Sequence, residues 1–230
     1  MRSFWSFIGN GKYSIGCTGQ TVYLFDGNGK ELAKFKDLIY AYKSAVSPSG
    51  DIFVVKTTEG RLGVYSFDPP ALIKKFRFSS KAAQDDGYCF SPDGQMFYNI
   101  ERDGLRTALS IYNTSDFSLK DKILDGDPFL DFSQVEYDAV TDMIYLLGYF
   151  RDKDKIAHDY FVGQLIGNEL KNTLTISNNE YDYYEWLIDL RLMGFTEKAY
   201  GWGYLDLDLD RLKSSDHSLA KLWKYYHDNR

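Results

Sequence analysis

Short runs of apolar residues, separated by polar turns, recur along most of the chain. In residues 45–78, a Ser-Pro-Ser-Gly turn, a Glu-Gly turn and an Asp-Pro-Pro turn separate three runs of six or seven residues. A similar pattern returns in residues 89–124. Short runs rich in β-branched and aromatic residues, bounded by Gly, Pro, Asp and Ser, are typical of β-strands joined by tight turns. The pattern therefore predicts an all-β chain.

The runs are grouped in repeated units of four. A turn precedes one strongly apolar run in each unit, and successive turns are 39, 44, 47 and 55 residues apart, at Gly11, Gly50, Gly94, Thr141 and Thr196. Four short strands per unit with a period of about 40–50 residues are typical of a β-propeller. We therefore expect a single domain over residues 1–230, a five-bladed β-propeller of four-stranded antiparallel blades. Its blades are expected at approximately 1–38, 39–80, 81–126, 127–178 and 179–230.

Two features of this architecture have alternatives. The first strands are expected at 3–8, 43–47, 87–91, 132–137 and 186–192, so blade one begins with its own innermost strand. Its contact with the last blade would then depend on side-chain packing, and the alternative is an incomplete ring that another chain completes. Residues 216–228 fit an outer strand, because 218–223 resemble 31–35, but their apolar spacing also fits a terminal helix.

The third unit carries a recognisable motif. Phe90-Ser91-Pro92-Asp93-Gly94, followed by an apolar strand and an Ile-Tyr-Asn strand, resembles the repeat signature of WD40-like and YVTN-type propellers. No Trp-Asp pair ends a third strand and no Gly-His pair opens a unit, so the chain departs from the strict WD40 pattern. The resemblance implies the fold but no single function, because such propellers serve many roles. Gly94 is expected to adopt a positive φ in its turn.

In propellers of the kind this chain resembles, the loops that lead into the innermost strands line one mouth of the central channel. Here those loops interleave aromatic residues with carboxylates, which suits a protein interface or a platform for sugars. The alternative is that these side chains plug the channel or pack between blades. The candidate binding residues are Tyr40, Tyr42, Asp86, Phe129, Asp131, Tyr183, Tyr184, Glu185 and Trp186.

Composition narrows the partners. The net charge is −6, with Lys and Arg scattered among Asp and Glu, which argues against nucleic acid and against an anionic membrane surface. No apolar stretch is long enough for a signal peptide or a membrane span, so we expect a cytoplasmic protein of bacterial type. The two cysteines, Cys17 and Cys89, are expected to be small buried apolar residues rather than part of a disulfide framework.

No motif in the sequence specifies an enzyme, a metal or a cofactor. Three carboxylates precede innermost strands of successive blades: Asp86, Asp131 and Glu185. Two of them could act as the acid and the base or nucleophile of a glycosidase only if the three loops brought them close together. Three aspartates at 206, 208 and 210 alternate with leucines, as on a solvated strand face, and lack the glycine of a calcium loop. The main hypothesis is a non-enzymatic scaffold that binds a protein or peptide, with no catalytic residue, cofactor or metal. The alternative is a carbohydrate-binding or glycoside-hydrolysing propeller.

Overall fold

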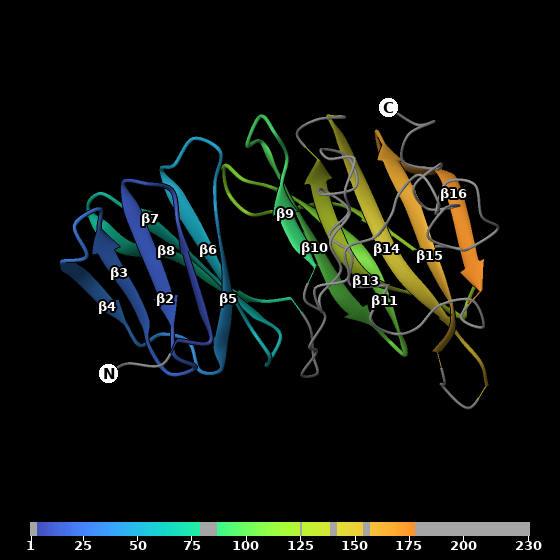
Figure 1. Ribbon diagram of the computed structural model, residues 1–230, viewed down its shortest axis with the longest axis horizontal. Helices are drawn as coiled ribbons and strands as arrows, with labels where there is room; N and C mark the ends of the chain where they lie inside the picture. The colour runs from blue at the N-terminus through green and yellow to red at the C-terminus, as the bar shows by residue number, and fades with distance from the viewer. Residues whose placement is uncertain (1–3, 79–86, 125, 139–141, 154–156, 178–230) are drawn as a thin grey trace, which may run out of the picture. The chain divides into compact units, whose positions relative to one another are not determined.

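The computed structural model describes residues 4–78, 87–124, 126–138, 142–153 and 157–177 (Figure 1). These residues form four sheets, each made of four consecutive strands paired antiparallel. The chain divides into two compact units, residues 1–124 and 125–230, which we describe separately. The predicted all-β class and the four-stranded antiparallel sheets are confirmed. The predicted fifth blade and the segment 216–228 lie outside the described residues.

The first unit holds three of the sheets. The first consists of β1 (Ser6–Gly9), β2 (Tyr13–Cys17), β3 (Val22–Asp26) and β4 (Glu31–Phe35). The second consists of β5 (Ala41–Val46), β6 (Ile52–Thr57), β7 (Arg61–Phe67) and β8 (Pro70–Arg77). The third consists of β9 (Tyr88–Phe90), β10 (Met96–Asp103), β11 (Arg106–Asn113) and β12 (Leu119–Ile123). In the second unit, the fourth sheet consists of β13 (Leu130–Asp138), β14 (Met143–Arg151), β15 (Ala157–Ile166) and β16 (Glu169–Ser177).

The second sheet is packed on both faces, because successive side chains of a strand point to opposite sides. Phe53 and Val55 of β6 pack with the first sheet, in a cluster that includes Cys17 and Leu24. Val54, between them, packs with aromatic residues of the third sheet that include Phe97. This explains why β6 reads as a continuous apolar run rather than an alternating one.

First strands of neighbouring sheets contact each other within the first unit. Strand β5 contacts β1 and β2 of the first sheet and β9 of the third. The three sheets therefore pack face to face, with their first strands grouped along one side.

The two Ser-Pro turns of the first unit are built alike. Gly50 donates its backbone N–H to Ser47 and Gly94 donates to Ser91, both at 2.9 Å. Both glycines have positive φ, +71° and +70°, a conformation that a residue with a Cβ adopts only at a cost. The expectation for Gly94 is confirmed. A Cβ on Gly94 would lie 3.5 Å from the ring of Pro48, so the two turns are in contact.

Candidate functional site

We call the end of each sheet at which its first strand begins the leading end. The residue just before the first strand is Trp5, Tyr40, Gly87 and Phe129 in the four sheets. Trp5, Tyr40 and Phe129 are large side chains that are 58%, 53% and 46% exposed. Three of the four described sheets thus carry an exposed aromatic residue at the same position.

Tyr40 is held by its backbone rather than by its ring. Its carbonyl accepts a hydrogen bond from the N–H of Thr58, at 3.2 Å. The next residue, Ala41, exchanges two backbone hydrogen bonds of 3.0 Å with Gly19 in the first sheet. These bonds hold Tyr40 at a φ of +56°. That conformation costs a residue with a side chain about 1–3 kcal/mol, so the surrounding bonds must maintain it.

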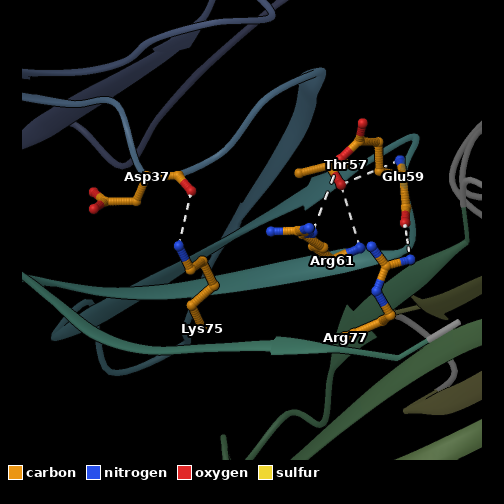
Figure 2. A network of polar contacts seen from close by, with 6 residues as sticks. All are labelled: Asp37, Thr57, Glu59, Arg61, Lys75 and Arg77. Atoms are coloured by element: carbon orange, nitrogen blue, oxygen red, sulfur yellow. Dashed lines mark hydrogen bonds and ion pairs between the residues drawn. The ribbon is translucent and has the colours of Figure 1, made fainter. Parts of the chain in front are cut away.

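A polar network from strand β8 braces the loops beside Tyr40 (Figure 2). Lys75 donates to the carbonyl of Asp37, in the loop before β5, at 3.2 Å. Arg77 donates to the carbonyl of Glu59, in the β6–β7 turn, also at 3.2 Å. The hydroxyl of Thr57 accepts the N–H groups of Glu59 and Arg61, each at 3.2 Å. The loops at the leading end of the second sheet are therefore tied to its outermost strand.

Trp5 rests on the same support as Tyr40. A Cβ added to Gly19 would lie 2.8 Å from the Trp5 ring, so the indole packs on this glycine. Because Gly19 is bonded to Ala41, the Trp5 ring and the Tyr40 backbone share one anchor. Trp5 was not among the predicted site residues, because the sequence pattern predicted a strand over 3–8 that includes it. The strand begins only at Ser6, and alternation among Phe4, Trp5 and Phe7 gives no signal for that boundary.

Phe129, in the second unit, shares one backbone hydrogen bond with Tyr40, although its φ is not positive. Its carbonyl accepts the N–H of Arg151 at 2.9 Å, as the carbonyl of Tyr40 accepts that of Thr58. Its own N–H donates to the carboxylate of Asp127 at 2.8 Å. The carbonyl before the first strand therefore accepts a hydrogen bond from the end of the second strand, or from the residue after it, in both sheets.

The other predicted site residues have different placements. Asp131 is only 2% exposed, and its carboxylate pairs with Arg151 at 2.7 Å, so it lies within β13 and not on an open surface. Tyr42 is half-buried at a bulge of β5, where the register shifts between Ala41 and Lys43. Asp86, Tyr183, Tyr184, Glu185 and Trp186 lie outside the described residues. The convergence of the full set therefore stays a prediction.

A buried polar cluster joins the strands of the third sheet. The Glu101 carboxyl group accepts hydrogen bonds from Asn99 at 3.0 Å, from Ser110 at 2.7 Å and from the Tyr112 hydroxyl. Burial, followed by the nearby Glu101, raises the pKa of Tyr112, which therefore stays a hydrogen-bond donor. Because the donors of this carboxyl group come from the same sheet, the cluster is built to stabilise the sheet.

A buried lysine ties the second sheet to the third. Lys56 of β6 is fully buried, and its ammonium donates to the carbonyl of Ile100 in β10 at 2.8 Å. The same ammonium lies 5.0 Å from the centre of the Phe78 ring and 5.8 Å from that of Tyr88. A carbonyl and two aromatic faces compensate for the lost hydration of the charge.

A cleft of about 360 Å³ lies at the opposite end of the sheets, between the second and the third; we call it the turn-end cleft. The two Ser-Pro turns and the β11–β12 turn form its walls, with part of β8. Its lining residues are Ser47, Ser49, Asp51, Ile52, Val64, Ile73, Lys74, Gly94, Gln95, Thr114, Ser115, Asp116 and Phe117. The turn-end cleft was not predicted from the sequence, because a turn motif indicates its own backbone conformation but not which other turn packs against it.

The cysteines and the possible metal ligands of the described residues were compared with the predictions made for them. Both cysteines are free thiols, and burial raises the pKa of Cys17 to about 11, so this thiol stays protonated at neutral pH. Within the described ranges, no three His, Cys, Asp or Glu side chains are grouped so that they could hold a metal ion. Nor does that part of the chain contain a helix with the length and apolar character needed to cross a membrane.

Comparison with known proteins identifies the fold but not a family. No protein-family model matches the sequence, and no curated protein is significantly similar to it. Among solved structures, Kuenenia stuttgartiensis hydrazine synthase matches with a TM-score of 0.60 and 15% identity, over 77% of this chain and 50% of that one. The WD40 domain of Toxoplasma gondii coronin matches with a TM-score of 0.56 and 16% identity, over 75% of this chain and 45% of that one.

These matches define a class of protein. The chain spans about half the length of the two solved structures. Together with the four consecutive antiparallel sheets, they show a fold of the β-propeller class, in which each sheet is a blade. At this level of identity the likeness concerns the fold alone.

Proposed function

We propose that this chain is a non-enzymatic β-propeller scaffold that binds a protein or peptide partner at the leading end of its blades. One observation carries the proposal: Trp5, Tyr40 and Phe129 are exposed aromatic residues at the same position of three blades. Aromatic side chains at a surface supply much of the energy of protein interfaces. The fold alone does not determine the function, because one solved match is a hydrazine synthase and the other is a WD40 domain.

The surroundings of these aromatics agree with a binding surface. Ile39, beside Tyr40, is also half-exposed, and exposed carboxylates stand in the same loops, Asp37 before β5 and Asp127 before β13. The backbone bonds of Tyr40 reduce the conformational entropy that is lost when a partner binds. The partner that fits best has an apolar side chain flanked by neutral or basic residues. The predicted mouth residues outside the described ranges would extend this surface.

A peptide selection tests this function. A random peptide library displayed on phage is selected against the purified protein, and the enriched peptides are made synthetically for affinity measurements. Because aromatic anchors each contribute on the order of 1–2 kcal/mol, we expect Trp5→Ala and Tyr40→Ala, two changes in the same unit, each to weaken binding about tenfold. Leu119→Ala is the matched control, since Leu119 is 53% exposed at the opposite end of its blade. Peptides that bind both aromatic variants as tightly as the wild type would refute the proposal.

We further propose that the ring has five blades, with residues 179–230 supplying the last. The repeat spacing of the sequence supports this count. A second observation is an aromatic cluster on one face of the first blade, made of Phe4, Phe7, Tyr23 and Phe25. Phe7 in this cluster is 56% exposed, so the face is not fully covered by the described residues. In a closed propeller, blades pack on both faces. A chain that ends at Ser177 should therefore bind a hydrophobic dye and melt at a lower temperature. If the shortened chain is as stable and monomeric as the full chain, the five-blade proposal fails.

A further inference from the structure

We propose that the turn-end cleft is a second binding site, which takes an arginine side chain of a partner protein. The site is distinct from the leading end, because Tyr40 precedes β5 and Ser47 follows it. The proposal therefore does not depend on the function assigned to the leading end. A cleft of about 360 Å³ is at the lower end of the range for ligand sites, which suits one long side chain rather than a large cofactor.

The walls of the cleft are rigid on the side of the two turns. The turn around Gly94 lies against Pro48, and the Thr114 hydroxyl donates to the carbonyl of Gly94 at 2.6 Å. The side chains of Val64 and Phe117 are buried, whereas Ile73 is half-exposed at the rim. An alkyl chain that enters the cleft would therefore meet an apolar wall.

The first anionic group of the cleft is Asp51. Ser47 donates its hydroxyl to the Asp51 carboxylate at 2.7 Å, and Ser49 donates to the same oxygen atom. These two hydroxyl donors hold the pKa of Asp51 below its ordinary value, so the group is charged at neutral pH.

The Ser-Pro turn of the third blade carries its aspartate at a different position from that of the second blade. In its Ser-Pro turn the carboxylate of Asp93 accepts from Ser91 and from the backbone N–H of Gln95. The carboxylate of the second blade stands two positions later in its turn, at Asp51, and lines the cleft.

The second anionic group is Asp116, in the β11–β12 turn. It accepts the backbone N–H of Ser118 at 2.8 Å, and this neighbour holds the pKa of Asp116 below its ordinary value. Lys74 is the one cation among the lining residues. Its ammonium donates to the backbone carbonyls of Asp116 and Phe117, so the β11–β12 turn already holds it. Two carboxylates against one ammonium leave the cleft with a net negative charge.

An arginine side chain matches these features better than other common groups. Its alkyl stem suits the apolar wall, and its guanidinium offers five N–H donors that can serve two carboxylates at once. The hydroxyl of Ser115 and the carbonyl oxygen of Gln95 are further acceptors in the lining.

The test is a titration of the full chain followed by NMR of its backbone amides. The probe is N-acetyl-arginine amide, and the matched control probe is N-acetyl-citrulline amide, which has nearly the same shape without the charge. We expect the arginine probe to shift the amides of Asp51, Gln95 and Ser115, and the citrulline probe to leave them unchanged. Added salt should weaken the binding.

Three variants complete the experiment. Asp51→Asn and Asp116→Asn should each weaken the arginine probe two- to fivefold, as expected for a partly exposed ion pair. Glu59→Gln removes the same charge at the leading end of the same blade and should have no effect. The side chain of Asp116 is exposed, so Asp116→Asn should not disturb the fold. This variant keeps the test valid even if Asp51→Asn disturbs the Ser-Pro turn of the second blade. Equal shifts by both probes, shifts confined to other residues, or unchanged binding by Asp116→Asn would each overturn the proposal.

Discussion

Two tyrosines occupy equivalent positions in neighbouring blades, and we expect replacement by Phe to change the free energy of unfolding in opposite directions. Tyr65 of β7 pairs with Phe53 of β6, and Tyr112 of β11 pairs with Phe97 of β10. Both tyrosines are buried. The hydroxyl of Tyr112 donates to the buried Glu101, whereas the hydroxyl of Tyr65 has no hydrogen-bond partner within the described part of the chain. Replacing either residue by Phe removes one oxygen atom and leaves the ring in place.

The expected free energies follow from the different environments. Tyr112→Phe loses a buried hydrogen bond and leaves the Glu101 carboxyl group with two donors, which should lower the free energy of unfolding by about 1–3 kcal/mol. Tyr65→Phe removes a buried polar atom that gains nothing from the fold, which should raise that free energy by up to about 1 kcal/mol. For a chain of this size, 1 kcal/mol corresponds to about 2–4 °C in Tm. The two variants should therefore melt several degrees apart, on opposite sides of the wild type.

The assay is thermal melting followed by circular dichroism, with urea unfolding at neutral pH as a second measure. A double-mutant cycle with Glu101→Gln should give a coupling energy of about 1 kcal/mol between positions 101 and 112. If both Phe variants lose the same stability, the two hydroxyls are equally engaged and the reasoning is wrong. If the cycle shows no coupling, Tyr112 acts through something other than Glu101.

Further predictions concern a turn, a thiol and a carboxylate. Gly94→Val should cost about 1–3 kcal/mol in urea unfolding because its φ is positive, whereas Gly126→Ala, with open space around it, should be neutral. Iodoacetamide should label Cys17 only after unfolding, because burial keeps the thiol protonated; rapid labelling of the native protein would contradict this. Ser91 holds the pKa of Asp93 below its ordinary value, so the stability from this contact is present above about pH 4 and is lost as the pH falls through the lowered pKa. Ser91→Ala should raise the pKa of Asp93 in a carboxyl NMR titration, and an unchanged pKa would rule out this contact as the cause.

The sequence predicted the parts of the fold that depend on local pattern. The four strands of each described blade follow from apolar runs and turns, and the positive φ of Gly94 follows from its Ser-Pro-Asp-Gly motif. The candidate site was predicted less well, because burial depends on partners distant in sequence. In the sequence Asp131 has the pattern of an exposed loop carboxylate. It is buried because it pairs with Arg151, which is twenty positions later in the chain. In the sequence Trp5 has the pattern of a strand residue. Its ring packs on Gly19, and nothing in the local pattern indicates this contact.

The backbone bond before the first strand, present in the second, third and fourth described blades, has a consequence for how such a protein can change over time. The carbonyls of Tyr40, Gly87 and Phe129 each accept an N–H from the second strand of the blade or from the residue just after it. Two of these residues are aromatic and the third has no side chain. The main chain thus tolerates different residues at this position. A mutation there can alter which molecule is recognised while leaving the hydrogen-bonded frame intact. Selection, natural or in the laboratory, can therefore explore new specificities at this position without breaking the carbonyl hydrogen bond.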